Sequence, residues 1–308
     1  MTAEIIDGRK IAEGVRLEVR EDVGRLVREY GIKPGLAVVL VGEDPASVSY
    51  VASKEKAAQE AGIDTTTFNL PADTHEEDVL NLIEELNHAP RFHGILVQLP
   101  LQEHTDTMAV VSAIDPMKDV DGLHPANGGM LLSGVPRFIP CTPAGVHRLL
   151  LAAGYPPDGK HVVICGRSPI VGSPMAALLL LKEVGANATV TVCHTGTPDI
   201  AAITRQADIL IAATGGRPQG ITGEMVKEGT VVVDVGIHRV EDPSKKMGYR
   251  LVGDVDIDSV KEKAKAITPV PGGVGPMTVA MLLVNTLKAA RLAVKTPLPG
   301  LTSQASPG

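Results

Sequence analysis

The sequence predicts an α/β protein made of two three-layer α/β domains with a cleft between them. The 308 residues leave room for two hydrophobic cores of roughly 100–150 residues each. Apolar runs of strand length alternate along the chain with helical patterns, which is the order expected of parallel sheets covered by helices. A loop-rich stretch with several prolines and glycines, Asp115 to Thr142, separates the two halves and is expected to line the cleft.

The first half of the chain contains three strand-like runs and two helical patterns. The strands are expected at Leu36–Val41, Thr65–Leu70 and Gly94–Leu99. The helices are expected near Pro45–Ala61 and His75–Asn87. For the first helix, Asp44 is a good N-cap, Pro45 suits the first helical position and Gly62 is a natural stop.

The second half contains four further apolar runs, with a helix predicted after each of the first three. These runs are His161–Cys165, Ala188–Cys193, Asp208–Ala213 and Thr230–Val235. A strongly apolar helix, Met277–Ala290, follows the glycine-rich segment TPVPGGVGP. We expect a first domain at 1–141, a second at 142–275, a helix at 276–291 that packs back on the first domain, and a disordered tail at 292–308.

Composition and charge favour a small-molecule ligand. The net charge is −7 and no segment gathers Lys and Arg residues, which argues against a nucleic acid or an anionic membrane as partner. The three cysteines, Cys141, Cys165 and Cys193, are widely spaced and indicate neither a disulfide framework nor a zinc site. With no leader-like start at Met1 and no apolar run long enough to span a bilayer, we expect a cytoplasmic protein with no metal site.

The segment VVICGRSPIVGSP predicts a phosphate-binding turn in the second half. An apolar strand runs directly into Gly166 and Gly172 and then into a helix, whose free N–H groups would point toward an anion. The form is Gly-x-Ser-x-x-x-Gly rather than the usual Gly-x-Gly-x-x-Gly. A doubly wound domain that binds another nucleotide, or none, is therefore the alternative.

The strand that follows this turn bears on the choice of dinucleotide. It ends about 20 residues beyond the last glycine, where an NAD site usually presents an acidic residue to the ribose hydroxyls. Here the chain has Cys193, His194 and Thr195. Because no carboxylate would repel a 2′-phosphate and Arg167 is available to pair with one, we predict NADP rather than NAD, bound to a Rossmann-like second domain.

The segment SVSYVASKEK places Tyr50 and Lys54 one turn apart on the same helix face. Lys54 falls on the apolar side, where it is either an edge lysine that extends to water or a partly desolvated amine that exchanges protons near neutral pH. A Tyr-x-x-x-Lys pair also invites a short-chain dehydrogenase interpretation. The order of the motifs argues against it, since in that family the pair follows the glycine turn, whereas here it precedes Gly166 by more than a hundred residues.

Gln98 lies in the apolar run ILVQLPL at the end of the third predicted strand. It is either a satisfied core amide or a site residue that hydrogen-bonds a neighbouring amine. Ligands of open α/β sheets gather at the carboxyl ends of strands, where Tyr50, Lys54 and Gln98 would all lie. We therefore favour the site interpretation.

Several longer strings carry a resemblance to a known family. They are SYVASK, GILVQLPL, KDVDGLHPAN, PCTP, GRSPIVGSP, VVVDVGI, VGDVD and ITPVPGGVGPMTVAML. In this order and spacing, over roughly residues 3 to 290, the chain resembles the bifunctional methylenetetrahydrofolate dehydrogenase/cyclohydrolase (FolD) family. The resemblance implies a homodimer with two activities in one cleft: NADP-dependent oxidation of 5,10-methylenetetrahydrofolate to the methenyl cation, and hydrolysis of that cation to 10-formyltetrahydrofolate.

The resemblance also implies roles for single residues. Lys54 is similar to the family's catalytic lysine, which handles protons as water attacks the methenyl carbon, and Gln98 to the residue that hydrogen-bonds it. Asp121 in DVDG matches the aspartate that binds the amino-pyrimidine of the pterin, and completes the implied catalytic set of Lys54, Gln98 and Asp121. The alternative for Asp121 is loop capping, the role expected of Asp119.

The remaining implied positions bind substrate or cofactor. Tyr50 would lie against the folate rings rather than donate a proton. The other substrate positions are Val97, Leu99, Pro271, Gly272, Gly273, Val274 and Gly275. The NADP positions are Gly166, Arg167, Ser168, Thr195 and Ile237.

Three functional hypotheses follow from these residues. The first is the bifunctional enzyme acting on tetrahydrofolate derivatives, which the presence of Lys54, Gln98 and Asp121 favours. The second is a folate- or nucleotide-binding protein on the same scaffold that has lost catalysis. The third is a dehydrogenase alone, which would accumulate the methenyl product without forming the formyl product.

Overall fold

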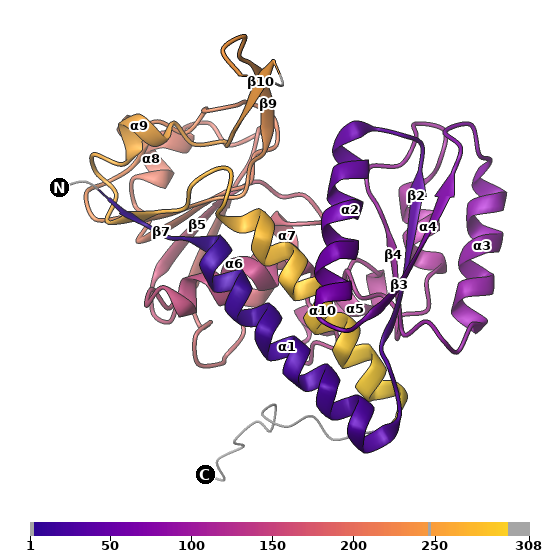
Figure 1. The fold of residues 1–308 in the computed structure, drawn as a ribbon. Coiled ribbons are helices and arrows are strands. Elements are labelled where there is room, and N and C mark those ends of the chain that lie inside the picture. Colours follow the sequence, from indigo (N-terminus) through magenta and orange to yellow (C-terminus); the bar gives the residue numbers. More distant parts are fainter. Residues whose placement is uncertain (1–2, 246–247, 295–308) are drawn as a thin grey trace, which may run out of the picture. The chain divides into compact units, whose positions relative to one another are not determined.

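The structure, a computed structural model of the chain, describes residues 3–245 and 248–294 and divides them into two compact units. One unit contains the described residues up to Val15 together with Pro125–Met281. The other contains Arg16–His124 and the described residues from Leu282 on. In the sequence, this boundary falls within two long helices, α1 (Gly8–Tyr30) and α10 (Val274–Ala293), both visible in Figure 1.

The unit of Arg16–His124 contains a three-stranded parallel sheet in the order β3-β2-β4. Its strands are β2 (Gly35–Val41), β3 (Asp64–Leu70) and β4 (Gly94–Val97). Its helices are α2 (Pro45–Glu60), α3 (Glu76–His88) and α4 (Thr107–Ala113). All three strands and the two helices predicted in the first half are confirmed, except that β4 ends two residues earlier than predicted.

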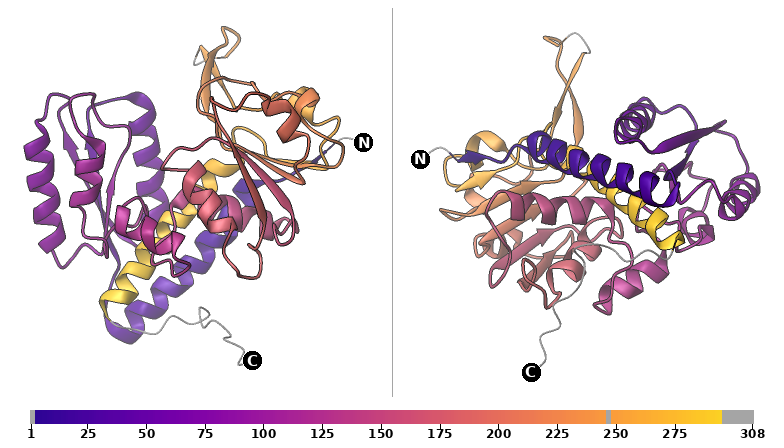
Figure 2. Two further views of the ribbon diagram at one scale, coloured as in Figure 1. Left: turned by 180° about the vertical axis from the view of Figure 1, so that it is seen from behind. Right: turned by 60° about the horizontal axis from the view of Figure 1, so that its bottom comes forward.

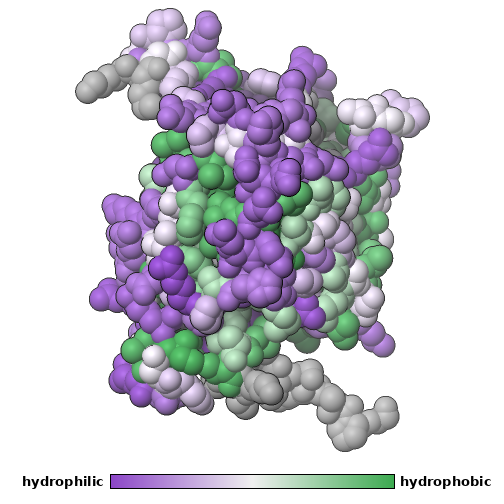
Figure 3. All heavy atoms as spheres, turned by 90° about the vertical axis from the view of Figure 1, so that its right-hand side faces the viewer, coloured by the Kyte–Doolittle hydropathy of each residue, from purple (hydrophilic) through white to green (hydrophobic). Residues whose placement is uncertain are grey.

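Burial explains why these elements pack as they do. Every residue of β2 is buried, as expected of a central parallel strand covered on both faces. On α3, Val79, Ile83 and Leu86 recur at intervals of three or four residues and pack in one cluster with β2 and β4 side chains. The opposite side of α3, turned to the viewer in Figure 3, forms a hydrophilic band.

The unit containing Pro125–Met281 has a six-stranded parallel sheet in the order β1-β11-β8-β7-β5-β6. The strands are β1 (Glu4–Ile5), β5 (His161–Cys165), β6 (Thr189–Cys193), β7 (Ile209–Ala212), β8 (Val231–Asp234) and β11 (Ala266–Ile267). After β5 the chain adds β6 on one side and β7 on the other, so the strand order reverses at β5. Such a switch point is where doubly wound sheets bind ligands, and the predicted Rossmann-like topology is confirmed.

Short helices and one hairpin complete this unit. The helices are α5 (Pro125–Leu132), α6 (Cys141–Ala152), α7 (Gly172–Leu179), α8 (Ile200–Thr204), α9 (Ile257–Val260) and a 3-10 helix, η1 (Gly223–Met225). Strands β9 (His238–Glu241) and β10 (Tyr249–Val252) form an antiparallel hairpin that projects from the unit in Figures 1 and 2.

Several elements were not predicted. The predicted loop-rich stretch from Asp115 to Thr142 contains α5 and the first residues of α6. Helix α1 was also missed, although it buries one apolar stripe at helical spacing. The buried residues of that stripe are Ala12, Val15, Val19, Val23 and Leu26.

The grouping of residues differs from the expected boundary at 141/142. Because β1 pairs with β11, the described residues up to Val15 group with Pro125–Met281. From Leu282 on, α10 groups with Arg16–His124, where Asn285 Nδ2 donates to Val120 O at 2.9 Å. The expected tail lies outside the described residues from position 295 on. No helix within the described ranges is long and apolar enough to cross a membrane.

Candidate active site

Helix α2 positions the first group of predicted site residues. Asp44 caps the helix by accepting a hydrogen bond of 2.8 Å from Ser47 N, and Pro45 occupies the first helical position, both as predicted. The helix ends at Glu60, two residues before the predicted stop Gly62, which has a φ of +81° that side-chain-bearing residues rarely adopt. Since α2 directly follows β2, its first turns lie at the carboxyl end of the sheet.

Lys54 is buried on the inner face of α2, with only 8% of its surface exposed. Its Nζ donates a hydrogen bond of 2.8 Å to Gln98 Oε1, which confirms the predicted contact. Gln98 is itself held in place, since its backbone N donates to Val39 O and its Nε2 donates to Leu99 O at 2.7 Å. The amide oxygen is therefore the atom presented to the lysine.

Tyr50 lies one helical turn before Lys54 and is half-buried. Burial raises the pKa of its phenol, so the ring stays uncharged at neutral pH. A neutral aromatic surface suits contact with a flat ligand better than it suits proton donation. The role of Tyr50 as a binding surface for the folate rings stays a prediction.

Two aspartates of the DVDG segment have different surroundings. Asp119 is buried and accepts hydrogen bonds from the backbone N atoms of Gly122, Leu123 and His124, so the loop-capping prediction for it is confirmed. Asp121 is partly exposed, and among the described residues its carboxylate makes no hydrogen bond or ion pair. A parallel bridge between Ile95 and Asp119 carries this segment alongside β4, toward the edge of the sheet where Gln98 lies.

Two positions beside Gln98 were also expected to bind substrate. Val97 is 4% exposed and packs in the core cluster with Val79, Ile83 and Val110, so only its backbone is available to a ligand. Leu99 is partly exposed. Side chains alternate between the faces of a strand, which explains why Gln98 and Val97 point to opposite sides.

The predicted dinucleotide turn lies in the other unit, at the switch point after β5. Gly166 has a φ of +132°, and a Cβ built on it would lie 2.0 Å from Ala213 O. A Cβ on Gly172 would lie 2.1 Å from Gly166 O, so the turn closes tightly onto the start of α7 only because both positions are glycine. Arg167 and Ser168 are exposed at this turn.

Thr195 follows the neighbouring strand at the same edge of the sheet. Cys165 of β5 pairs with Cys193 of β6, so the residues after these two strands are neighbours. Thr195 is exposed, and the first carboxylate after β6 is that of Asp199, the N-cap of α8. The turn, the exposed arginine and the missing acid fit a dinucleotide with a 2′-phosphate.

The other predicted cofactor and substrate positions of this unit lie together. Ile237 is 42% exposed, and a Cβ built on Gly275 would lie 3.9 Å from its Cδ1. Gly272 has a φ of +114°. The loop also has a contact that the sequence did not indicate, because a Cβ on Gly8 would lie 1.9 Å from Gly273 O, so the start of α1 packs directly against it.

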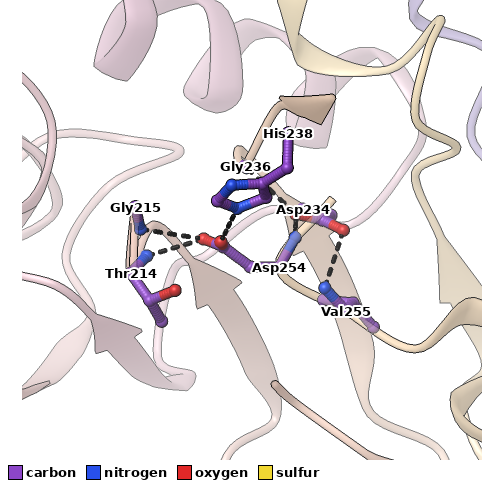
Figure 4. Close-up of polar contacts among 7 residues, drawn as sticks. All are labelled: Thr214, Gly215, Asp234, Gly236, His238, Asp254 and Val255. Carbon is purple, nitrogen blue, oxygen red and sulfur yellow. Dashed lines mark hydrogen bonds and ion pairs between the residues drawn. The ribbon is translucent and has the colours of Figure 1, made fainter. Parts of the chain in front are cut away.

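Sequence reasoning also missed a buried polar cluster made of Asp234, His238 and Asp254 (Figure 4). The two carboxylates accept hydrogen bonds from backbone N atoms, and His238 Nε2 contacts Asp254 Oδ1 at 2.7 Å. Burial raises the pKa of Asp234 to about 6. The available signal was an aspartate directly after a fully apolar strand, in VVVDVG, followed by a second in VGDVD.

Within residues 3–245 and 248–294, no group of three or more His, Cys, Asp or Glu side chains is placed to hold a metal ion. The three cysteines are free thiols in the structure, and all are buried. Burial raises the pKa of Cys165 to about 12, so this thiol is protonated at neutral pH.

Comparison with known proteins identifies a family for each half of the chain. Residues 6–121 match the model of the tetrahydrofolate dehydrogenase/cyclohydrolase catalytic domain. Residues 140–294 match the model of the NAD(P)-binding domain of the same family.

Whole proteins of this kind are similar over nearly their full length. The bifunctional protein FolD of Moorella thermoacetica is 56% identical over 291 residues, covering 94% of this chain and all of that protein. FolD of Syntrophus aciditrophicus is 54% identical over 292 residues, covering 95% and 99%.

Solved structures agree with these matches. The Trypanosoma brucei FolD enzyme, complexed with NADP and an inhibitor, has a TM-score of 0.90 and 44% identity, covering 96% of this chain and 100% of that one. The Campylobacter jejuni enzyme has a TM-score of 0.87 and 46% identity, covering 94% and 99%. The chain therefore belongs to the tetrahydrofolate dehydrogenase/cyclohydrolase family, with bifunctional FolD proteins as its relatives.

Proposed function

We propose that Lys54, Gln98 and the glycine turn at Gly166 carry the two reactions of this family in this chain. The enzyme oxidises 5,10-methylenetetrahydrofolate to 5,10-methenyltetrahydrofolate with NADP, and hydrolyses the methenyl compound to 10-formyltetrahydrofolate. The part-buried hydrogen bond between Lys54 and Gln98, at 2.8 Å, is the observation that supports this proposal most directly. A buried amine fixed by an amide is a group built to move protons.

In the hydrolysis, water adds to the methenyl carbon, which carries positive charge shared with the two flanking nitrogens. The attacking water must lose a proton as the carbon–oxygen bond forms, and Lys54 is the group proposed to receive it. Opening of the ring at one carbon–nitrogen bond then turns the hydroxyl into the formyl C=O on the other nitrogen. Of the two protons of the water, one ends on the released nitrogen and the other passes to solvent. Gln98 keeps the Lys54 amine at a fixed position throughout.

Two further residues of this unit are proposed to hold the folate. The Tyr50 ring offers a neutral flat surface to the pterin. The Asp121 carboxylate, which has no partner among the described residues, suits the paired N–H donors of an amino-pyrimidine. Val97 and Leu99 lie on either side of Gln98 and are proposed to contact the folate through their backbone.

In the oxidation, NADP supplies the acceptor for the electron pair and hydrogen that leave the methylene carbon. The protein's own task is to bind and orient. The phosphates of NADP are proposed to bind at Gly166, Arg167, Ser168 and Thr195. The turn from Gly166 to Ser168 is tight, Arg167, Ser168 and Thr195 are exposed, and none of the four residues is acidic. Ile237 and the loop from Pro271 to Gly275 are proposed to contact the nicotinamide end of NADP and the substrate.

The assembly and location are also proposals. We propose a homodimer that works in the cytoplasm; the three free cysteines fit a reducing compartment. We further propose that residues 1–141 make up the folate-binding, catalytic domain, and 142–275 the NADP-binding domain. The start of the second domain at 142 lies close to residue 140, where the NAD(P)-binding family model begins, whereas its end at 275 lies closer to Met281, where the grouping by contacts ends this unit.

The test is a spectrophotometric assay of the purified protein with methylenetetrahydrofolate and either NADP or NAD. Methenyl absorbance should rise only transiently with NADP and give way to the formyl product. Methenyl product that accumulates would indicate a dehydrogenase alone. Absence of both products would contradict the proposed function and favour a binding protein on the same scaffold.

A further inference from the structure

We propose that His238 and Asp254 are positioning residues for the dinucleotide, because they fix the backbone on both sides of Ile237. The inference rests on the proposed function, in which Ile237 meets the nicotinamide end of NADP. Neither residue was identified by the sequence as part of the cofactor site. They form, with Asp234, the buried polar cluster drawn in Figure 4.

Asp254 connects two loops that follow neighbouring strands. Its Oδ2 accepts hydrogen bonds from Thr214 N at 2.6 Å and from Gly215 N at 3.4 Å, in the loop after β7. Its Oδ1 accepts from His238 Nε2 at 2.7 Å, at the start of β9, just beyond β8. The Asp254 side chain is fully buried and that of His238 is 16% exposed, so this contact is shielded from water.

Asp234 fixes the same region from the other side. It ends β8 and accepts hydrogen bonds from Gly236 N at 3.0 Å, Asp254 N at 2.9 Å and Val255 N at 3.0 Å. Ile237 therefore lies between two anchored residues, with Gly236 held by Asp234 and His238 held by Asp254. The exposed Ile237 side chain is attached to a backbone that has little freedom to move.

Two glycines make this arrangement possible. A Cβ built on Gly236 would lie 2.5 Å from Asp254 Cγ, and one built on Gly253 would lie 1.8 Å from Asp234 Oδ2. Neither distance is tolerable, so the two carboxylates can approach the backbone this closely only where both glycines are present. If this cluster served only to fill the core, it would not need carboxylates, and the carboxylates would not need to lie so close to the backbone.

The location agrees with a role in positioning the cofactor. The anchored loops follow β7 and β8, at the carboxyl edge of the sheet where doubly wound folds bind ligands. Ile237 also lies near Gly275, part of the loop that the proposed function assigns to the substrate and nicotinamide end. A shift of this backbone by a fraction of an ångström would misalign the reacting carbons and weaken the contact with the nicotinamide end of NADP, while the phosphate contacts remain.

The experiment compares three variants with the wild-type enzyme. His238→Ala removes the donor to Asp254, His238→Gln restores an N–H at similar reach, and Asp208→Asn is the matched control. Asp208 forms an ion pair of 2.8 Å with Lys227 in the same unit, just before β7 and so at the opposite end of the sheet. Dehydrogenase kcat and the KM for NADP are measured, together with cyclohydrolase rate and NADP affinity by calorimetry.

We expect His238→Ala to lower dehydrogenase kcat/KM for NADP by about 10- to 100-fold. His238→Gln should recover most of this loss, and Asp208→Asn should be unchanged. The cyclohydrolase rate, which depends on Lys54 and Gln98, should stay within about twofold for all three. A dehydrogenase loss that the glutamine does not rescue, or an equal loss of both activities, would show a merely structural role and overturn the inference.

Failure of this inference can be distinguished from failure of the proposed function. A wild-type enzyme that turns over with a fully active His238→Ala variant refutes only the positioning role. A wild-type protein without dehydrogenase activity refutes the proposed function, and the calorimetric affinities still decide the positioning role. In that case His238→Ala must bind NADP more weakly than both the wild type and His238→Gln, and equal affinities refute the inference.

Discussion

Lys54 and Gln98 are 44 residues apart in the sequence, yet Lys54 Nζ and Gln98 Oε1 are joined by a hydrogen bond of 2.8 Å. The parallel pairing of β2 with β4 brings them together, because α2 starts where β2 ends and Gln98 directly follows β4. Gln98 Nε2 is already bonded to Leu99 O, so its amide cannot turn away from the lysine. The sheet, rather than the local sequence, thus sets the geometry of the proposed catalytic pair.

Replacement of Lys54 by methionine tests the proton-transfer role. Methionine keeps the length and apolar stem of the side chain but removes the amine, so we expect cyclohydrolase turnover to fall by about 100-fold or more, while NADP binding is largely kept. Decay of methenyl absorbance measures the rate. Lys56→Met, on the exposed side of the same helix, is the matched control and should be fully active. Normal hydrolysis by Lys54→Met would rule out Lys54 as the proton-handling group.

Gln98→Met tests whether the side-chain amide of Gln98 contributes to catalysis or only fills space in the core. The variant removes the acceptor for Lys54 Nζ, and leaving a buried donor without its partner costs about 1–3 kcal/mol. We therefore expect cyclohydrolase kcat to fall by roughly 10- to 100-fold. Gln59→Met, at an exposed position of α2, is the control. If both variants hydrolyse at the wild-type rate, Gln98 is a core amide with no catalytic effect.

Local patterns predicted the parts of this site that depend on one element. The N-cap Asp44, the helix start at Pro45 and the place of Lys54 on the apolar face of the helix all follow from helix geometry and are present. Whether Lys54 extends to water or is buried could not be decided from the sequence, and the structure shows it buried. Asp119 was expected to cap a loop because aspartates before glycine turns accept nearby N–H groups, and it accepts three.

Other parts could not be predicted because their stability comes from distant contacts. Strands β1 and β11 are two residues long, too short for any periodic pattern, and form because β1 pairs with β11 and β11 pairs with β8. The position of Asp234 directly after an apolar strand is a signal in the sequence, but its contact with Asp254 is not, since the backbone donors that allow their burial become neighbours only in the folded sheet. Gly8 likewise gives no signal that it contacts Gly273.

Cofactor preference is testable at Thr195. A carboxylate at this position would accept hydrogen bonds from the ribose of NAD and repel the 2′-phosphate of NADP. We expect Thr195→Asp to lower the ratio of kcat/KM with NADP to that with NAD by about tenfold or more. Arg167→Ala should act in the same direction, because it removes the exposed cation at the turn. Thr189→Asp, exposed at the other end of β6, should leave the ratio unchanged. A ratio unaffected by Thr195→Asp would remove this position from the cofactor site.

Lys118 should be a major stabilising residue of its unit. Its Nζ donates to three carbonyl oxygens at the end of α3, those of Leu86, Asn87 and Ala89, at 3.0, 2.6 and 3.0 Å. Burial lowers the pKa of this amine, but it remains a donor to all three. We expect Lys118→Met to lower the free energy of unfolding by about 2–4 kcal/mol, measured by urea denaturation, because carbonyls that cap a helix lose their partner.

Lys33→Met is the control for Lys118. Lys33 forms an ion pair with Asp64 in the same unit, but both side chains are more than half exposed, so the change should stay within about 0.5 kcal/mol. If the free energy of unfolding changes by a similar small amount in both variants, solvent satisfies the carbonyls at the end of α3 when Lys118 is removed.

The pKa of Asp234 makes stability depend on pH in an unusual direction. Burial, followed by the nearby Asp254, raises this pKa from 3.8 to about 6, while three backbone N–H groups oppose the shift. Between these two values the native protein binds more protons than the unfolded chain, so the free energy of unfolding falls as pH rises. The contribution is fully present below pH 3.8 and is lost as pH passes about 6.

The measurement compares wild type with Asp234→Asn by urea denaturation from pH 4 to pH 7. Asparagine does not titrate, so the wild-type advantage over the variant should shrink by about 2–3 kcal/mol across this range, whatever its size at pH 4. Asp208→Asn is the control, because the hydrogen bond with Lys227 lowers the pKa of Asp208. The difference in the free energy of unfolding between wild type and Asp208→Asn should therefore not shrink as pH rises. A wild-type advantage over Asp234→Asn that stays constant or grows with pH would show that the buried Asp234 is ionised throughout, with its backbone donors outweighing its burial.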